Sequence, residues 1–348
     1  MSLVLDYSNG VFAAKPTGGS LGTDPSTIGD ANFADVSLLL HGDGTSGSTI
    51  ITDSSSNAVV VTANGNAQID TAVKKFGTGS IEFDGTGDYL TLGSGTPNYP
   101  NFGTGPFTIE MWIYNTTSGS QALFNTHRAG VSSGMYFSIN TNNALVHGSF
   151  GNGDNGNNIT ANNVISLNTW HHIALCREGT GTNQTKIFVD GTAVLTYTDA
   201  SNYASYTYGP YLASYDVGGT TAEYTGYIDD LRVTSGIARY TSNFTPPTAA
   251  FLNSGPTLDL SSGTYFNYAP SANTTFAFAN PPASGTAAGF ALAVTPSATV
   301  TLTYPASVEW PSGTAPDAPA SGETDVLVFL TDDGGTSYQG FQAGDAMS

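Results

Sequence analysis

The sequence is poor in cysteine and in basic residues. Cys176 is the single cysteine among 348 residues, so no disulfide can form within the chain. Lysine and arginine together number 8 against 27 acidic residues, which gives a formal net charge of −19. Because phosphate backbones and anionic membrane surfaces are bound by basic side chains, this balance disfavours nucleic acid and membranes as partners.

Long hydrophobic runs are also missing. No segment approaches the ~18 uninterrupted apolar residues of a transmembrane helix, so we expect no membrane insertion. The first residues, MSLVLD, have neither the basic region nor the long apolar stretch of a secretory signal peptide, and we expect no such signal. A protein that acts outside the cell without a signal would be released by lysis of its host, as virion proteins are.

The chain is instead rich in small polar residues and in alternating strand patterns, which predict an all-β fold of many short strands joined by turns. Residues 107–114 (FTIEMWIY) alternate with period two, so one set of side chains should lie between two sheets. Residues 186–194 predict a hairpin, because Asp190 and Gly191 suit the positive φ angles of a type I′ turn. We interpret Cys176 as a small buried strand residue.

Three regions follow one another along the chain. Residues 1–34 are polar and glycine-rich, and we interpret them as an extended arm that docks on a partner; a flexible terminus is the alternative. Residues 35–250 contain strand after strand, and Pro246 and Pro247 near their end place a boundary near 247–256. Residues 257–348 predict a second, smaller β domain, in which the strand 325–330 (DVLVFL) is apolar enough to be buried on both faces.

Five motifs in the second region occur in a fixed order. They are KFGTGSIEFDGTGDYL at 75–90, FTIEMWI at 107–113, WHHIAL at 170–175, IFVDG at 187–191 and IDDLRV at 228–233. Together they resemble the laminin-G-like jelly roll of the concanavalin A-like superfamily. The resemblance implies a β-sandwich that usually binds glycans or proteins rather than turning over substrate.

The last region carries a second resemblance. The segments WPSGTAP at 310–316, GETDV at 322–326 and GFQAGDAM at 340–347 look like a small β domain that ends many phage tail-fibre and virion proteins. This resemblance implies a structural or oligomerising module of a virus particle.

Candidate catalytic residues are sparse. Glycoside hydrolysis needs two carboxylates about 5–10 Å apart across a groove, yet the strand where the superfamily's glucanases carry several acids holds only Glu110. Glu82 and Asp84 are two residues apart, but Asp84 opens a turn. His171 and His172 are adjacent on a predicted strand and point to opposite faces, so they cannot share one metal ion. We therefore predict that the protein is not an enzyme.

Acidic residues in loops raise the question of calcium, which takes six to eight oxygen ligands. Laminin-G-like relatives often hold one calcium at a rim of the sandwich. The positions that look like that site are Asp43, Asp53 and Asp229, and one structural calcium is an expectation. The alternative is that these aspartates cap backbone amides in turns.

A ligand face is suggested by tyrosines crowded into residues 197–227 and by the asparagine-rich stretch 140–163. Tyrosine rings offer large rigid surfaces on which the apolar faces of sugars can stack. The ligand-binding residues that we predict from these two stretches are Tyr206, Tyr208, Tyr211, Tyr215, Asn155 and Asn157. Contact with a neighbouring subunit is the alternative role for the tyrosines.

These observations favour a phage virion protein exposed on the particle surface, as a tail fibre, appendage or capsid decoration, made in the host cytoplasm. Its arm would contact other virion proteins, and its lectin-like domain would bind a glycan or protein of the host surface. Many weak sites in a homo-oligomer, such as a trimer, would bind with avidity. A secreted bacterial lectin or adhesin module is the alternative, and a glycan-degrading enzyme is a third possibility.

Overall fold

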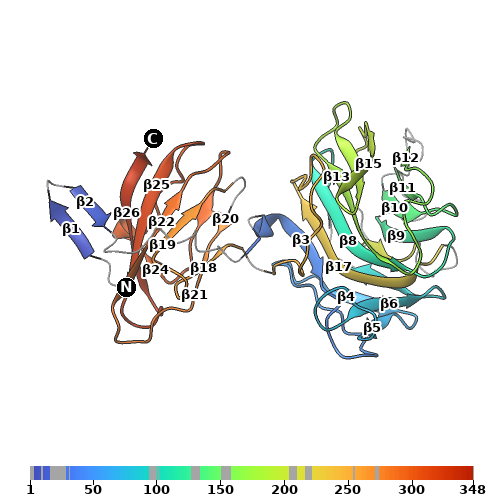
Figure 1. Cartoon of the computed structure of the whole chain (residues 1–348), viewed down its shortest axis with the longest axis horizontal. Coiled ribbons are helices and arrows are strands. Elements are labelled where there is room, and N and C mark those ends of the chain that lie inside the picture. The colour runs from blue at the N-terminus through green and yellow to red at the C-terminus, as the bar shows by residue number, and fades with distance from the viewer. Residues whose placement is uncertain are drawn as a thin grey trace. The chain divides into compact units, whose positions relative to one another are not determined.

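The computed structural model describes residues 4–8, 11–15, 29–30, 32–93, 100, 102–126, 134–149, 158–203, 210–215, 222–253, 255–270 and 274–347. These residues form an all-β structure, as predicted, with two short 3-10 turns (Phe33–Asp35 and Pro311–Gly313) and no α-helix. None of the helices among them is long and apolar enough to cross a membrane. The chain divides into two compact units, residues 35–251 and residues 1–34 together with 252–348 (Figure 1).

Residues 35–251 form a sandwich of two large sheets, seen as two facing layers in Figure 1. The first sheet has the order β15 (Thr192–Tyr197), β14 (Thr185–Val189), β13 (Trp170–Arg177), β8 (Phe107–Asn115), β17 (Thr225–Ser235), β6 (Ser80–Asp84) and β5 (Gln68–Asp70), and β3 (Val36–Leu40) also pairs with β17. The second has the order β12 (Asn158–Ile159), β11 (Leu145–Ser149), β10 (Met135–Ile139), β9 (Gln121–Asn125), β16 (Tyr211–Leu212), β7 (Tyr89–Leu92) and β4 (Val61–Asn64).

The core lies between these sheets and follows from the alternation of the strands. On β8, Phe107, Ile109, Met111 and Ile113 are fully buried in the main hydrophobic cluster, as predicted. The opposite side of β8 is not simply exposed, because Thr108, Glu110 and Trp112 are buried as well. A second layer of side chains must therefore cover part of the sheet's outer side, which is the side that carries Glu110.

The predicted hairpin is confirmed. Strands β14 and β15 pair antiparallel around Asp190 and Gly191, whose φ angles are 48° and 77°. Two successive positive φ angles are those of a type I′ turn, whose twist matches that of the flanking strands. Cys176 is 1% exposed on β13, which also confirms the prediction of a buried cysteine.

The smaller unit is built on the five-stranded sheet β19 (Tyr265–Tyr268), β22 (Ala288–Val294), β25 (Thr324–Thr331), β26 (Tyr338–Met347) and β24 (Val308–Glu309). Its other described pairs are β18 (Thr257–Asp259) with β21 (Ala277–Ala279), β20 (Thr274–Thr275) with β23 (Leu302–Thr303), and β1 (Val4–Ser8) with β2 (Val11–Lys15). Phe266, Phe290 and Phe329 belong to its core cluster. Residues 1–34, predicted to be a separate arm, group with this unit.

One expectation for this unit is wrong. Strand β25 is not buried on both faces, because Leu327 and Phe329 are buried whereas Val326 and Val328 are half-buried and Leu330 is exposed. An apolar run alone does not distinguish a strand covered on both sides from one covered on a single side.

Candidate functional site

The outer side of the first sheet is divided into a covered half and an open half. The covered half lies under residues 237–251, the covering segment, which follows β17. Tyr240 and Phe244 of this segment stack with ring centroids 3.5 Å apart, and Phe244 lies 5.4 Å from the ring of Phe188. Phe251 lies 3.8 Å from the guanidinium of Arg232. The covering segment therefore removes this half of the sheet from solvent.

Glu110 is the carboxylate that lies beneath the covering segment. Its side chain is 0% exposed and accepts hydrogen bonds from Arg232 (Nε at 2.9 Å, Nη2 at 2.7 Å) and from the Tyr240 hydroxyl at 2.8 Å. Burial alone would raise the pKa of Glu110, but Arg232, His172 and Arg239 lower it to about 2. A carboxylate that stays ionised, paired and out of reach of solvent stabilises the fold and cannot act as a general acid on a bound sugar.

The open half carries three half-buried aromatic side chains from three neighbouring strands. Tyr227 of β17 and Trp170 of β13 are the direct cross-strand partners of Tyr114 of β8. The ring centroid of Tyr114 lies 5.9 Å from that of Tyr227 and 5.5 Å from that of Trp170. We call Tyr227, Tyr114 and Trp170 the aromatic row.

Polar side chains extend the aromatic row at one end. Glu82 of β6 pairs with Tyr227 in register and accepts a hydrogen bond from its hydroxyl at 3.4 Å. Gln68 of β5 comes next and donates to the other oxygen of Glu82 at 3.0 Å. Burial and the charge of Glu82 raise the pKa of Tyr227, so its hydroxyl stays protonated at neutral pH. The row thus combines apolar ring surface with hydrogen-bonding groups, which is the chemistry that sugars need.

The two predicted ligand-binding residues that the structure describes are not part of the aromatic row. Tyr211 is on β16 of the second sheet, 3% exposed, with its ring 6.2 Å from Tyr89. Tyr215 is half-buried, 5.9 Å from the ring of Tyr136. The rest of the prediction, Tyr206, Tyr208, Asn155 and Asn157, lies outside the described residues and stays a prediction. Sequence reasoning missed Tyr114 and Trp170 because only the pairing of β8 with β13 brings them together.

The three aspartates predicted to bind calcium differ in their hydrogen-bond partners. Both oxygens of Asp53 accept hydrogen bonds, from the amides of Leu39, Ser55 and Val59 and from the Ser55 hydroxyl, at 2.7–2.9 Å. Asp43 accepts hydrogen bonds from the amide and hydroxyl of Thr78. No group of three or more histidine, cysteine or acidic side chains among the described residues could hold a metal ion. Asp53 has the role of a turn cap.

Asp229 differs from the other two aspartates. Its Oδ2 accepts from the amides of Lys75 (2.7 Å) and Phe76 (3.0 Å), whereas its buried Oδ1 has no partner in the part of the chain that the structure describes. Burial, together with the charges of Asp230 and Asp43, raises the pKa of Asp229 to about 7 despite the two amides. The calcium prediction thus depends on this one free oxygen and stays a prediction.

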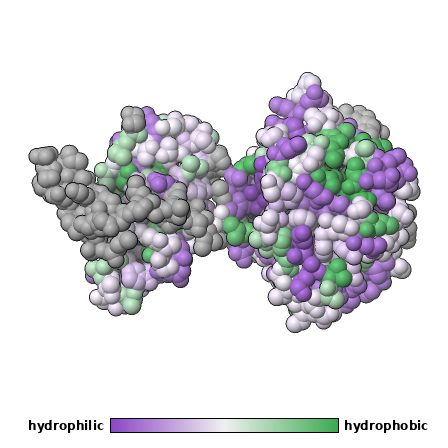
Figure 2. Space-filling view, viewed as in Figure 1, coloured by the Kyte–Doolittle hydropathy of each residue, from purple (hydrophilic) through white to green (hydrophobic). Residues whose placement is uncertain are grey.

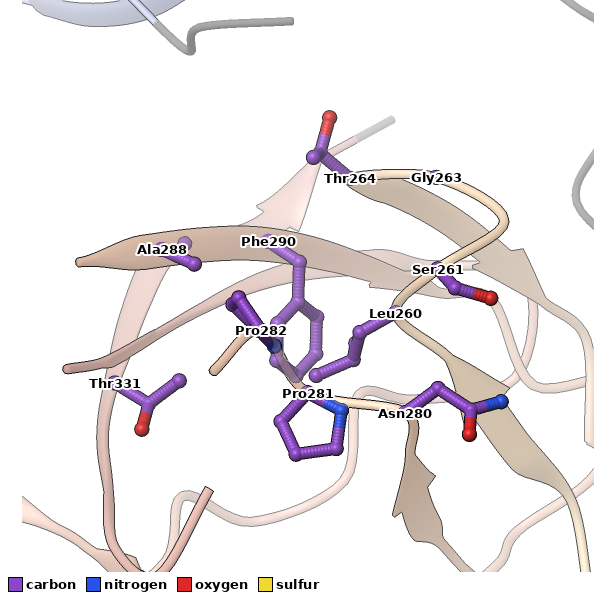
Figure 3. A pocket seen from close by; sticks show the side chains of 11 residues that line it. Leu260, Ser261, Gly263, Thr264, Asn280, Pro281, Pro282, Ala288, Phe290 and Thr331 are labelled. Atoms are coloured by element: carbon purple, nitrogen blue, oxygen red, sulfur yellow. The ribbon is translucent and has the colours of Figure 1, made fainter. Parts of the chain in front are cut away.

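A separate groove lies in the smaller unit. Phe290, Leu260, Pro281 and Pro282 converge on a space of about 560 Å³ at whose border Thr331 and Thr264 lie (Figure 3). Among the described residues, no charged side chain and no histidine lines this groove. Figure 2 shows that hydrophobic residues form patches between hydrophilic ones on the visible side of the sandwich unit.

The family comparison agrees with this geometry. Residues 84–238 match the model of the concanavalin A-like lectin/glucanases superfamily (Laminin_G_3). The sandwich unit is thus a concanavalin A-like jelly-roll domain, as predicted. No curated protein matches the chain.

Several solved structures are similar to this chain at low identity. The binding domain of Paraclostridial Mosquitocidal Protein 1 has 15% identity and a TM-score of 0.47, over 60% of this chain and 50% of that one. The binding domain of botulinum neurotoxin serotype G has 12% identity and a TM-score of 0.46, over 59% and 48%. Domain 4 of AbnA, a GH43 extracellular arabinanase from Geobacillus stearothermophilus in complex with arabinotriose, has 16% identity and a TM-score of 0.43, over 59% and 94%. The chain spans about half the length of the two toxin domains.

Proposed function

We propose that the sandwich unit binds carbohydrate, without hydrolysing it, and that the aromatic row is the binding surface. The observation that carries the proposal is the alignment of Tyr227, Tyr114 and Trp170 on the open half of the sheet, with Glu82 and Gln68 at one end. Rings in this position can stack on the apolar faces of sugars, and the polar pair can accept and donate hydrogen bonds to hydroxyl groups.

The choice between binding and hydrolysis depends on the acids. A glycosidase would need a second carboxylate across the site from Glu82. Asp70 of β5 lies at the same end of the row as Glu82 and not across from it, and its Oδ1 accepts hydrogen bonds from the amides of Ala72 and Val73. Glu110 lies on the same side of the sheet but is sealed beneath the covering segment and paired with Arg232. Binding is therefore the function that this arrangement supports.

Within this proposal, we infer that the protein acts on the surface of a phage particle and attaches the particle to its host. The support is the resemblance of residues 310–347 to virion domains and the strongly acidic composition, which suits a soluble, self-repelling surface. The arm at residues 1–34 would contact other virion proteins, and several copies would bind with avidity. Gene neighbourhood tests this part, since capsid and tail genes should flank the gene.

The binding proposal is tested by a glycan array followed by titration of the best ligand. Tyr114→Ala and Trp170→Ala should each weaken binding by up to about tenfold, because an aromatic contact contributes about 0.5–1.5 kcal/mol. Tyr265→Ala is the matched control, since Tyr265 is a 46% exposed tyrosine in the other unit and should have no effect. Unchanged affinity in both row variants would refute the assignment, and release of reducing sugar by the wild type would refute the absence of hydrolysis.

A further inference from the structure

Lys75 is unusual among the basic side chains that the structure describes. The others have partners: Arg177 pairs with Asp199, Lys186 with Glu178, and Arg232 and Arg239 with Glu110, while Lys74 donates to the Thr71 carbonyl. Within the described residues, the Lys75 ammonium has no ion pair and no hydrogen bond. In a chain with 27 acidic and 8 basic residues, a cation without a carboxylate partner calls for an explanation.

The position of the Lys75 ammonium is well defined by its surroundings. It lies 3.9 Å from the centre of the Trp112 ring, and the neighbouring ring of Phe76 meets Trp112 edge-on at 5.8 Å. The backbone amides of Lys75 and Phe76 are both held by the buried carboxylate of Asp229. The loop is therefore anchored to the sheet, and the ammonium needs little ordering before it binds a ligand.

Lys75 also lies beside the aromatic row. Trp112 and Tyr114 are two residues apart on β8, so both are on the outer side of the sheet. Tyr114 is the centre of the row, and Trp112 is the first ring beyond it toward the covered half. A sugar stacked on Tyr114 would thus have Glu82 at one end of the row and Lys75, which lies over Trp112, next to it in the direction of β8.

We propose that Lys75 binds the carboxylate of an acidic sugar, so that the glycan recognised by this surface contains uronic acid units. This inference rests on the proposed function of the aromatic row. An ammonium already stacked on an indole can donate a charge-assisted hydrogen bond to a carboxylate, whereas a neutral sugar offers it only hydroxyl groups as acceptors. The charge of Glu82 repels the same carboxylate, so the two charges orient the ligand.

The net charge of −19 does not oppose this assignment at close range. Exposed charges separated by more than about 8 Å are largely screened at physiological ionic strength. For a carboxylate that already contacts the row, the nearby charges, Lys75 and Glu82 among them, therefore matter more than the net charge of the chain. Repulsion at longer range should slow association with acidic polysaccharides at low salt.

The test uses an array on which each acidic polysaccharide is printed in its native form and in its carboxyl-reduced form. The proteins are the wild type, Lys75→Met, which keeps an apolar stem over Trp112, Lys75→Arg, which keeps the charge, and Lys74→Met as the matched control. We expect the wild type to prefer native uronate polymers by about tenfold, which is the effect of one charge-assisted hydrogen bond. Lys75→Met should abolish this preference, and Lys75→Arg and Lys74→Met should keep it.

The outcomes separate this inference from the function on which it rests. Equal binding of both forms, unchanged in Lys75→Met, would overturn the role of Lys75 but leave the aromatic row as a binder of neutral glycans. Absence of binding to any polymer by a folded wild type would overturn both proposals. A preference for uronates that survives in Lys75→Met would place the carboxylate contact on another residue.

Discussion

Acidification should destabilise the sandwich through His147, a fully buried residue of β11. Its Nδ1 is hydrogen-bonded to the Tyr197 hydroxyl, and its Nε2 lies 3.1 Å from the Tyr203 hydroxyl, which donates to Asp199 at 2.9 Å. A neutral imidazole satisfies both contacts, with Nε2–H donating to Tyr203 and Nδ1 accepting from Tyr197. Protonation of Nδ1 would place a charge in the core and would require the Tyr197 hydroxyl to turn its own proton away in order to accept.

The size of the effect follows from the pKa of His147, which burial and Arg177 lower from 6.5 to about 4 although Asp199 opposes this. A difference of about 2.5 between the folded and unfolded values corresponds to about 3 kcal/mol. Because the folded pKa is depressed, this contribution to stability is complete above pH 6.5, is lost as the pH falls from 6.5 to 4, and changes no further below that.

The assay is urea unfolding of the wild type and of His147→Gln, whose amide can both donate and accept, at intervals from pH 7.5 to pH 4.5. The difference in unfolding free energy between the two proteins should shrink by about 2.5 kcal/mol as the pH falls to 4.5. Asp229, with its pKa of about 7, becomes neutral in the same window and stabilises the fold, but this effect is common to both proteins and cancels. A difference that does not vary with pH would show that His147 does not have a depressed pKa in the folded protein.

Two further predictions concern the cysteine and the expected calcium ion. Burial raises the pKa of Cys176 to about 12, so the native protein should not react with a disulfide reagent at pH 8 and should release one equivalent of chromophore in guanidinium; rapid reaction of the native protein would contradict the burial. If a calcium ion binds at the free oxygen of Asp229, addition of a chelator should lower the melting temperature of the wild type but not that of Asp229→Asn. An identical melting temperature with and without chelator would argue against a structural ion.

The elements of the sandwich could be predicted from sequence where the signal is local. The alternation of residues 107–114 and the Asp190–Gly191 turn each depend on a few neighbouring residues, and both are confirmed. The aromatic row could not be predicted in the same way. Tyr114 and Trp170 are far apart in the chain, and only the register of β13 against β8 makes them neighbours.

Burial of the second side of β8 also depends on distant residues. The alternation placed Glu110 on the outer side of the sheet, which is correct, but gave no sign that Tyr240 and Arg232 would enclose it. The tyrosine-rich stretch 197–227 shows the same dependence on distant contacts. Tyr203, Tyr211 and Tyr224 are buried, because a tyrosine can place its ring in a core and its hydroxyl on a buried partner.

The covering segment is the main structural argument for the proposal that this domain, in a superfamily named for both lectins and glucanases, binds carbohydrate without hydrolysing it. A glucanase site would require the side of β8 that carries Glu110 to be open, with an acid free to change its protonation state. Here that position is filled by Tyr240 and Arg232, and the pKa of Glu110 is about 2. Removal of the Tyr240 ring would not open a catalytic site, since Arg232 would still hold the carboxylate ionised. The open half of the sheet, where three rings lie side by side and the Lys75 ammonium has no carboxylate partner among the described residues, is therefore the part of the domain to which we assign ligand binding.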